Sequence, residues 1–184
     1  MKFQETKLKG SYLINHDNHN DKRGFFERIF CQKTFQTFLK EKNIRQINHS
    51  FTKKKGTVRG LHFQYPPHAE IKIVSCLKGK VWDVAIDIRK GSPTFMEYHA
   101  VTLSESNLQS FFIPEGFAHG FQTLADDCEM LYFHTADYNA NAEGTLNALD
   151  QRLKIQWPKI ITEQSGRDMI NPMLNENFLG VKIL

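Results

Sequence analysis

The sequence predicts an all-β protein, an antiparallel β-sandwich or barrel with a few short helices. Short segments rich in β-branched and aromatic residues recur along the chain, separated by turn signals about every ten residues. Only one long segment has the apolar spacing of an amphipathic helix. The 184 residues are 40% hydrophobic and 12% aromatic, which is enough to bury one core, so we expect a single domain over residues 1–184.

The expected elements follow in chain order. The predicted strands are residues 12–15, 44–52, 57–64, 69–77, 81–89, 94–103, 109–113, 119–124 and 129–135. A polar loop is expected at residues 16–22. The helix is expected at residues 32–43, where Phe35, Phe38 and Leu39 have i, i+3, i+4 spacing. Residues 147–154 predict a short helical turn, and the chain from residue 157 onward reads as irregular.

Residues 57–74 place charged side chains inside strand-like sequence. Strict alternation puts Arg59 and His62 on opposite faces. Gly60 lies between them, and an isolated glycine in a strand often marks a β-bulge, which would move Arg59 onto the face of His62. With Lys72 on the next strand, a base and two cations would then face an anionic substrate. The structural alternative is that His62 is a core or rim residue and that Lys72 extends from a sheet edge to solvent.

Two further strands carry polar side chains in an alternating pattern. Gln46, Asn48 and Ser50 share one face of residues 44–52, which is either a solvent side or the wall of a polar pocket. On the residues alone, the solvent side is favoured. Asp83 alternates with apolar neighbours, so we expect it to be partly buried and to need a polar partner.

The net charge of +4 suits nucleic acid, a phosphorylated small molecule or no anionic partner at all. Positive residues are scattered apart from the run Lys53, Lys54 and Lys55, which we expect at a solvated hairpin tip. No nucleic-acid partner is therefore predicted.

Cys31, Cys76 and Cys128 are widely spaced and odd in number, which favours neither a disulfide framework nor a zinc ribbon and indicates a reducing compartment. The N-terminus lacks the apolar segment of a signal peptide, and no stretch approaches the roughly 20 apolar residues that span a bilayer. We expect a cytoplasmic protein without a membrane partner.

Two segments in the second half of the chain add candidate site residues. Residues 114–119 form a PxGxxH motif ending in His119, and Tyr132 alternates with apolar neighbours, which is typical of a packed ring as well as of a catalytic acid. PxGxxH resembles the second cupin motif, in which a jelly roll carries metal ligands. The first cupin motif would supply HxH, whereas this chain has His62 followed by Gln64. Because glutamine is a poor substitute for imidazole, we do not expect the three-histidine metal centre of cupins.

Over nearly its whole length the chain resembles the dTDP-4-dehydrorhamnose 3,5-epimerase family, whose members are metal-free cupins. The motifs that carry the resemblance are RGFF at 23–26, QINHS at 46–50, GTVRGLHFQ at 56–64, PPHAEIK at 66–72, WDVAIDIRKGSPTF at 82–95, IPEGFAHGF at 113–121, LYFHTADY at 131–138 and SGRD at 165–168. The resemblance implies a cupin jelly roll and a cofactor-independent epimerase. We also expect a homodimer in which the N-terminal strands pair with another subunit.

The resemblance implies a catalytic set of four residues. His62 would remove a proton next to the C4 ketone of a nucleotide-linked sugar, and Asp168 would orient and charge it. Lys72 would stabilise the enolate oxygen, and Tyr132 would return a proton from the opposite face. Inversion needs this set, because the base and the acid must lie on opposite sides and the developing oxyanion needs a cation or donor.

The resemblance also implies a substrate-binding set. Arg23 and Arg59 match positions that hold the nucleotide diphosphate, and His119 matches a second histidine paired with Asp83. The remaining implied substrate-binding residues are Phe26, Gln46, Asn48, Tyr138 and Glu143.

Departures from the family pattern leave the substrate open. Arg28 stands where the family often has a carboxylate, Gln151 follows Asp150 where proline is usual, and Glu70 replaces a frequent glutamine. The leading interpretation is 3,5-epimerisation of a dTDP-linked 4-keto-6-deoxyhexose on the way to L-rhamnose for a surface polysaccharide. The alternatives are a GDP-linked heptose or another nucleotide-linked 4-keto sugar, inversion at C3 alone, a metal-dependent cupin oxygenase, and a catalytically silent sugar-binding cupin.

Overall fold

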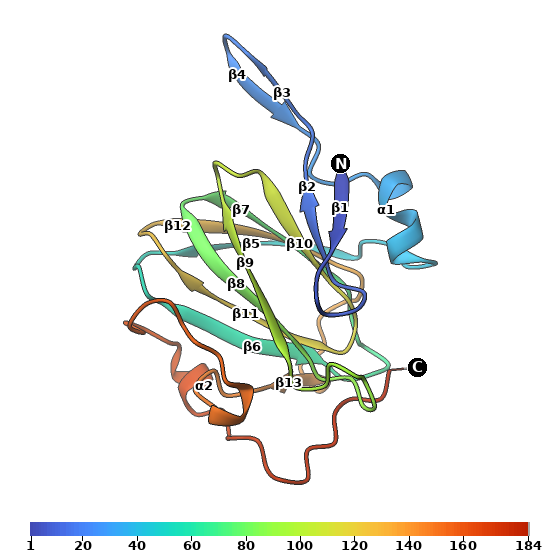
Figure 1. The fold of residues 1–184 in the computed structure, drawn as a ribbon, viewed down its shortest axis with the longest axis vertical. Coiled ribbons are helices and arrows are strands. Elements are labelled where there is room, and N and C mark those ends of the chain that lie inside the picture. Colours follow the sequence, from blue (N-terminus) through green and yellow to red (C-terminus); the bar gives the residue numbers. More distant parts are fainter. Residues whose placement is uncertain (184) are drawn as a thin grey trace.

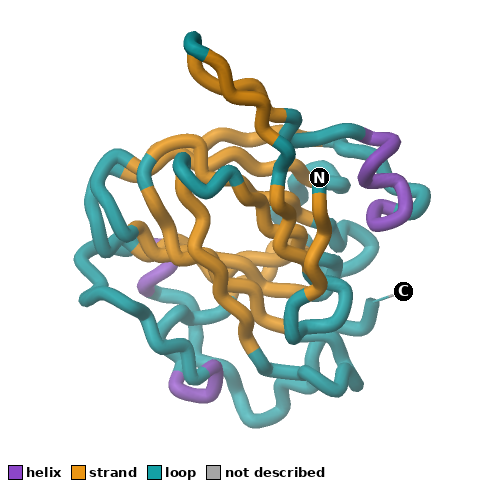
Figure 2. The backbone as a smooth tube through the Cα atoms, turned by 45° about the horizontal axis from the view of Figure 1, so that its top comes forward, coloured by secondary structure: helices purple, strands orange, loops and turns teal. Residues whose placement is uncertain are grey.

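The computed structural model describes residues 1–183 as two antiparallel β-sheets packed face to face (Figure 1). Strands dominate, and the short helices lie at the periphery (Figure 2). Consecutive strands frequently lie in different sheets, as in a jelly roll. The predicted all-β jelly roll is confirmed.

The six-stranded sheet has the order β1-β2-β10-β7-β12-β5, so β1 and β5 are its edges. Its strands are β1 (Lys2–Glu5), β2 (Tyr12–Asn15), β10 (Gln109–Ile113), β7 (Lys72–Lys78), β12 (Cys128–His134) and β5 (Gln46–Thr52). Five of these were expected within a few residues of their bounds. Strand β1 was not predicted, because its mostly polar residues have no apolar alternation.

The five-stranded sheet has the order β13-β6-β11-β8-β9. Its strands are β13 (Glu143–Thr145), β6 (Val58–Gln64), β11 (Phe117–Thr123), β8 (Lys80–Asp87) and β9 (Tyr98–Ser104). Strand β13 was not predicted, because its three residues are too few to show an alternating pattern. Since β5 and β6 belong to different sheets, the exposed lysines Lys53, Lys54 and Lys55 lie on a connection between sheets, and the predicted hairpin tip is wrong.

A two-stranded hairpin projects from the body of the chain, where a polar loop was expected (Figure 1). Its strands are β3 (Asn18–Asp21) and β4 (Gly24–Glu27), which pair antiparallel. Nearly all of its residues are exposed, so the sequence lacks the alternation of apolar and polar residues that identifies a half-buried strand. The loop prediction for this segment is wrong.

Helices are few and short. The helix α1 (Gln32–Leu39) buries Phe35 and Leu39 and ends four residues before the predicted end. A 3₁₀ turn at Gln151–Leu153 confirms the predicted helical turn. The helix α2 (Gly166–Met169) lies in a segment that was expected to be irregular, since one turn carries no helical period.

Apolar side chains form three clusters that define the layers. The first cluster lies between the sheets and includes Val74, Phe121 and Met130. The second packs the outer face of the five-stranded sheet against the C-terminal segment, and the third packs the six-stranded sheet against α1. The inner faces of both sheets therefore form a common interior, of which the first cluster fills only one part.

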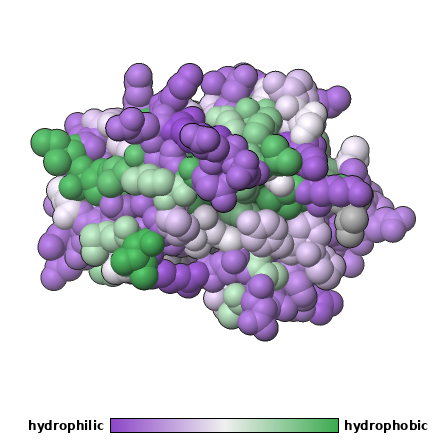
Figure 3. Space-filling view, turned by 90° about the horizontal axis from the view of Figure 1, so that it is seen from below, coloured by the Kyte–Doolittle hydropathy of each residue, from purple (hydrophilic) through white to green (hydrophobic). Residues whose placement is uncertain are grey.

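The face of the molecule seen from below is largely hydrophilic, with separate apolar patches (Figure 3). The most exposed apolar side chains of the C-terminal segment are Ile160, Met169, Ile170, Met173 and Leu179. Within residues 1–183, no helix has the length and apolar character that would let it cross a membrane.

Candidate active site

A β-bulge at Gly60 decides which side chains of β6 face the interior. Gly60 and Leu61 together oppose the single residue Gly120 of β11. The φ angle of Gly60 is +116°, and a Cβ there would lie 2.7 Å from the Gly120 Cα, so glycine is required. The extra residue sends Leu61 into the core while Arg59 and His62 line one cavity. The predicted bulge is confirmed, and the strict alternation that separated Arg59 from His62 is wrong.

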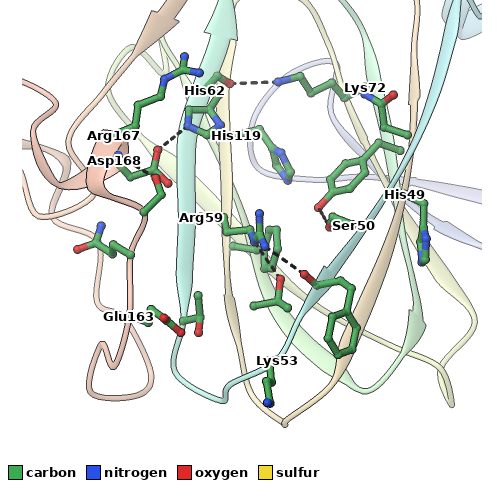
Figure 4. A pocket seen from close by; sticks show the side chains of 18 of the residues that line it. His49, Ser50, Lys53, Arg59, His62, Lys72, His119, Glu163, Arg167 and Asp168 are labelled. Carbon is green, nitrogen blue, oxygen red and sulfur yellow. Dashed lines mark hydrogen bonds and ion pairs between the residues drawn. The ribbon is translucent and has the colours of Figure 1, made fainter.

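This cavity has a volume of about 690 Å³ and lies between the two sheets. Strands β6 and β11 form one wall, strands β5, β7 and β12 form the other, and residues 163–168 close one side (Figure 4). The predicted site residues that line it are Asn48, Arg59, His62, Lys72, His119, Tyr132 and Asp168. All four residues of the implied catalytic set thus meet in one cavity, although they lie up to 106 positions apart in the sequence.

His62 and Asp168 form a hydrogen-bonded pair, with 2.7 Å between Nε2 and Oδ1 (Figure 4). The His62 side chain is 36% exposed, whereas that of Asp168 is 4% exposed. Burial alone would raise the pKa of Asp168, but the hydrogen bond and the charge of His62 hold this pKa below its ordinary value. The ionised carboxylate favours the tautomer with a proton on Nε2, which leaves Nδ1 able to accept a proton.

The turn that precedes α2 fixes Asp168. Ser165 caps this helix, and its Oγ accepts a hydrogen bond from the Asp168 backbone N–H at 3.0 Å. The second carboxylate oxygen of Asp168 accepts from the Gly60 N–H at 3.4 Å. Asp168 is thereby tied both to its own segment and to the bulge beside His62.

A second pair, His119 and Asp83, lies deeper in the interior. The His119 Nε2 lies 2.9 and 3.0 Å from the two carboxylate oxygens of Asp83, and both side chains are buried. The two residues come from the neighbouring strands β11 and β8. The expectation that Asp83 is buried with a partner is confirmed.

Lys72 places its ammonium group at the cavity wall next to His62. Its Nζ donates to the His62 backbone oxygen at 3.1 Å (Figure 4). The Nζ also lies 3.4 Å from the Glu70 Oε1. Only 10% of the side chain is exposed, so it does not extend to solvent. A cation with this little solvent is well suited to stabilise a developing oxyanion.

Tyr132 belongs to the wall opposite His62, because β12 and β6 lie in different sheets. Its hydroxyl lies 3.0 Å from the Ser50 Oγ. Burial raises the pKa of Tyr132 above its ordinary value of 10.0. The phenol therefore keeps its proton at neutral pH and can donate it.

We expect Tyr132 to resist ionisation at alkaline pH. Because the pKa of Tyr132 is raised, its protonated form persists above the ordinary value of 10.0. Absorbance titrations of the wild type and of Tyr132→Phe should therefore coincide up to about pH 10 and diverge only above it. A difference in tyrosinate absorbance already present at pH 9.5 would show that the phenol is not shielded from solvent.

Arg59 extends along the cavity beside β5. Its Nε donates to the Thr52 Oγ1 at 2.9 Å, and its Nη2 donates to the Phe51 backbone oxygen at 3.1 Å. Lys53 and Arg167 also line the cavity. This arrangement of positive side chains suits a phosphate-bearing ligand.

The implied residues Gln46, Asn48, Tyr138 and Glu143 form a hydrogen-bonded series at one rim. Gln46 donates to Asn48 and accepts from the Tyr138 backbone N–H, both at 3.0 Å, and the Tyr138 hydroxyl donates to Glu143 at 2.7 Å. Of the four, Asn48 lines the cavity. Ser50 is half-buried and hydrogen-bonded to the Tyr132 hydroxyl, so the favoured solvent-side interpretation is wrong for Ser50, whereas Asn48 both lines the cavity and is exposed to solvent.

Arg23 and Phe26 do not join the cavity within the single chain. Both lie on the projecting β3–β4 hairpin, where the Arg23 side chain is 90% exposed and Phe26 is 65% exposed. Arg23 forms an ion pair with Asp21 of the same hairpin. Local pattern cannot specify where such an exposed hairpin docks.

Several lining residues were absent from the predicted set. Arg167 forms an ion pair with Glu143, and Glu163 lies on the neighbouring stretch of chain. His134 also lines the cavity, and its alternation with Tyr132 along β12 was a signal that could have identified it. Glu163 had no such signal, because it lies in an irregular segment.

Gln64, at the second position of the incomplete HxH motif, stabilises a loop. Its amide donates to the backbone oxygens of His68 and Asp137, at 3.1 and 3.3 Å, and accepts from the Asn139 N–H at 2.7 Å. Among residues 1–183, no group of three or more histidine, cysteine, aspartate or glutamate side chains is placed to hold a metal ion.

Known proteins that resemble this chain are epimerases of nucleotide-linked sugars. A relative from Salmonella typhimurium, dTDP-4-dehydrorhamnose 3,5-epimerase, is 44% identical over 177 residues, covering 95% of this chain and 96% of that protein. A crystal structure of dTDP-6-deoxy-D-glucose-3,5-epimerase from Legionella pneumophila, in complex with dTDP-4-keto-L-rhamnose, has a TM-score of 0.91 and 34% identity. It covers 100% of this chain and 99% of that chain.

A more distant solved structure is that of a 3′-monoepimerase from Streptomyces bikiniensis in complex with dTDP-quinovose. Its TM-score is 0.85 at 27% identity, and the match covers 91% of this chain and 85% of that chain. The family model described as dTDP-4-dehydrorhamnose 3,5-epimerase matches residues 5–176. The chain belongs to the dTDP-4-dehydrorhamnose 3,5-epimerase family, a family of isomerases.

Proposed function

We propose that this enzyme inverts C3 and C5 of dTDP-4-dehydro-6-deoxyglucose to give dTDP-4-dehydrorhamnose. The observation that carries the proposal is the pairing of His62 with Asp168 on one cavity wall and the presence of a protonated Tyr132 on the other. Epimerisation needs this arrangement, because a proton must leave one face of the sugar and return to the opposite face.

The sugar ring lies between His62 and Tyr132 in this mechanism. The free Nδ1 of His62 takes the proton from a carbon next to the C4 ketone, and Asp168 stabilises the imidazolium that forms. Tyr132 then gives its proton to the same carbon from the other side. After each inversion His62 releases its proton to solvent and Tyr132 regains one from solvent. Because C3 and C5 both flank C4, the same base and acid can then serve both centres.

Lys72 meets the negative charge that develops on O4. Its ammonium group lies beside His62 at the cavity wall, so the enolate oxygen and the departing proton are served from adjacent positions. An ammonium group with little solvent around it stabilises an oxyanion more strongly than one in water. Arg59, with its guanidinium fork, holds the diphosphate, and His119, held by Asp83, lines the inner part of the cavity. Gln46, Asn48, Tyr138 and Glu143 lie near the nucleotide and sugar.

Turnover of matched substrates tests the choice of nucleotide. The enzyme is incubated with the dTDP-linked and GDP-linked forms of the same 4-keto sugar, and epimerised product is followed by NMR. We expect faster turnover of the dTDP sugar, in keeping with the names of the relatives. Preference for the GDP sugar would overturn the nucleotide assignment while leaving the reaction class intact.

Inversion at C3 alone is the second candidate function. It is favoured by one observation, the similarity to the 3′-monoepimerase, although this match has lower identity than the 3,5-epimerases named above. Product stereochemistry separates the two, because inversion at C3 alone leaves C5 in the D configuration.

We expect metal removal to leave turnover unchanged. The reaction proposed here uses only the protons and charges of protein side chains, and Gln64 directs its amide to backbone groups of a loop. Exhaustive chelation followed by an activity assay measures this. Activity that is lost on chelation and restored by iron or zinc would overturn the metal-free assignment.

The enzyme is also proposed to act as a homodimer in which the β3–β4 hairpin of one subunit docks at the cavity mouth of the other. Phe25 and Phe26 are 56% and 65% exposed on the hairpin, and Ile47 and Phe51 are 59% and 49% exposed on the edge strand β5. Covering these apolar groups would stabilise the pair. Arg23 would then reach the diphosphate of the partner's substrate.

Sedimentation tests the dimer. The wild type should sediment at twice the chain mass of 21.4 kDa at micromolar concentration. Phe26→Ser should shift the protein toward monomer, because it removes apolar area from the hairpin. Ile170→Ser, at an 82% exposed position of the C-terminal segment, is the control and should leave the dimer intact. A monomeric wild type would contradict the dimer.

Residues 1–184 are proposed to form one domain, supported by the cluster of apolar residues that both sheets share. The cytoplasm is the proposed compartment. Free cysteines at positions 31, 76 and 128 support it, because reduced thiols are typical there.

A further inference from the structure

A third histidine–carboxylate pair lies directly behind Lys72. The Glu70 Oε2 lies 2.8 Å from the His134 Nδ1, and its Oε1 lies 3.4 Å from the Lys72 Nζ. The exposed fraction of the side chain is only 9% for Glu70, 13% for His134 and 10% for Lys72. Glu70 is thus a buried carboxylate with one partner on each oxygen.

His134 ties this pair to the cavity wall. Its ring packs against that of Tyr132 with 6.2 Å between centroids and 30° between planes, and its Nε2 lies 3.4 Å from the Asn48 Nδ2. In the sheet, His134 lies directly opposite Lys72 in the β12–β7 register. The position of His134 is therefore fixed from three sides.

The charge of Glu70 depends on these partners. Burial alone would raise the pKa of Glu70, but the hydrogen bond with His134 and the charge of Lys72 hold this pKa below its ordinary value. The carboxylate is consequently ionised at neutral pH. Glu70 does not line the cavity, whereas Lys72 and His134 do, so it can influence a bound ligand only through them.

We propose that Glu70 and His134 are positioning residues for Lys72, which hold its ammonium group at the point where the sugar O4 becomes negative. The proposal rests on the proposed function, because it assigns Lys72 to that oxygen. A flexible lysine side chain gains catalytic value when its ammonium group is fixed, and misplacement by about 1 Å can cost about a hundredfold in rate.

Two substitutions at Glu70 test whether this carboxylate positions Lys72. Glu70→Leu removes both acceptor oxygens. It should lower the rate at which deuterium from solvent enters the sugar, measured at saturating substrate, by about a hundredfold. Glu70→Gln keeps an oxygen for Lys72 and should recover exchange to within about tenfold of wild type. The dissociation constant of dTDP, measured by calorimetry, should change by less than about twofold in both variants, because Glu70 does not face the ligand.

Two substitutions at His134 test whether the histidine also helps to position Lys72. His134→Phe keeps a ring against Tyr132 but removes Nδ1, whereas His134→Asn keeps a donor near the Nδ1 position. We expect about a tenfold loss of exchange in the first and recovery in the second. Glu115→Leu is the matched control, because it breaks a Glu–Lys pair of 2.7 Å with Lys42 away from the cavity. It should retain the wild-type exchange rate.

The outcomes separate this proposal from the proposed function. Exchange within threefold of wild type in folded Glu70→Leu and His134→Phe would overturn the positioning role, and so would an equal loss of exchange and of dTDP affinity. If Glu70→Leu does not fold by circular dichroism, His134→Phe and His134→Asn decide the question by the same criteria. A wild type that exchanges no sugar protons would overturn the proposed function, and this proposal with it.

Discussion

Replacing His62 by asparagine should lower both solvent exchange and epimerisation by at least about a hundredfold, the usual scale for losing a general base. Asparagine keeps a polar side chain near Asp168 but has no nitrogen that can accept a proton. Proton abstraction is the step shared by exchange and inversion, so both rates fall together. Deuterium incorporation and product formation, followed by NMR in the same sample, measure the two.

His99→Asn is the matched control for this variant. His99 lies on β9 against the Phe111 ring, and it does not line the cavity. Its substitution should leave both rates near those of the wild type, provided that circular dichroism shows a folded protein. Near-normal exchange in His62→Asn would refute the assignment of His62 as the base.

Removing the Tyr132 hydroxyl should separate exchange from inversion. In Tyr132→Phe the ring remains among its apolar neighbours, while the group that keeps its proton up to alkaline pH is lost. The carbanion still forms at His62, so exchange with retained configuration should survive better than inversion. We expect inversion to fall by about a hundredfold, within the usual range for a general acid.

Tyr98→Phe serves as the control for the loss of a phenol. Tyr98 packs against Trp82 on the outer side of the five-stranded sheet, so its hydroxyl has no part in the reaction. If Tyr132→Phe abolished exchange while His62→Asn retained it, the two roles would be reversed and Tyr132 would be the base.

The sequence alone predicts those parts of the site in which the pattern of residues along one strand determines where a side chain points. Gly60 indicated a bulge and so brought Arg59 to the same cavity as His62. Asp83 was expected to need a partner because it alternates with apolar residues, and His119 is that partner. In the first case an isolated glycine inside a strand carried the information, and in the second case the period of the strand carried it.

Such patterns do not predict contacts between segments that lie far apart in the sequence. Asp168, which is hydrogen-bonded to His62, lies in a one-turn helix within a segment that has no periodic pattern. Only the resemblance to a family predicted that the two residues act together. The β3–β4 hairpin is exposed on both faces, so its residues carry no burial signal. Glu70 differs from a frequent glutamine in the family, but its pairing with Lys72 and His134 required the register of β7 and β12.

Solvent-deuterium labelling of dTDP-4-dehydro-6-deoxyglucose tests the central claim most directly. The wild-type enzyme is incubated with this sugar in D₂O, and the positions and configurations of labelled carbons are determined by NMR. We expect deuterium at both C3 and C5, with a product of L-rhamno configuration, because both carbons flank the C4 ketone between His62 and Tyr132. Deuterium at neither carbon, or at C3 alone with C5 unchanged, would contradict this claim.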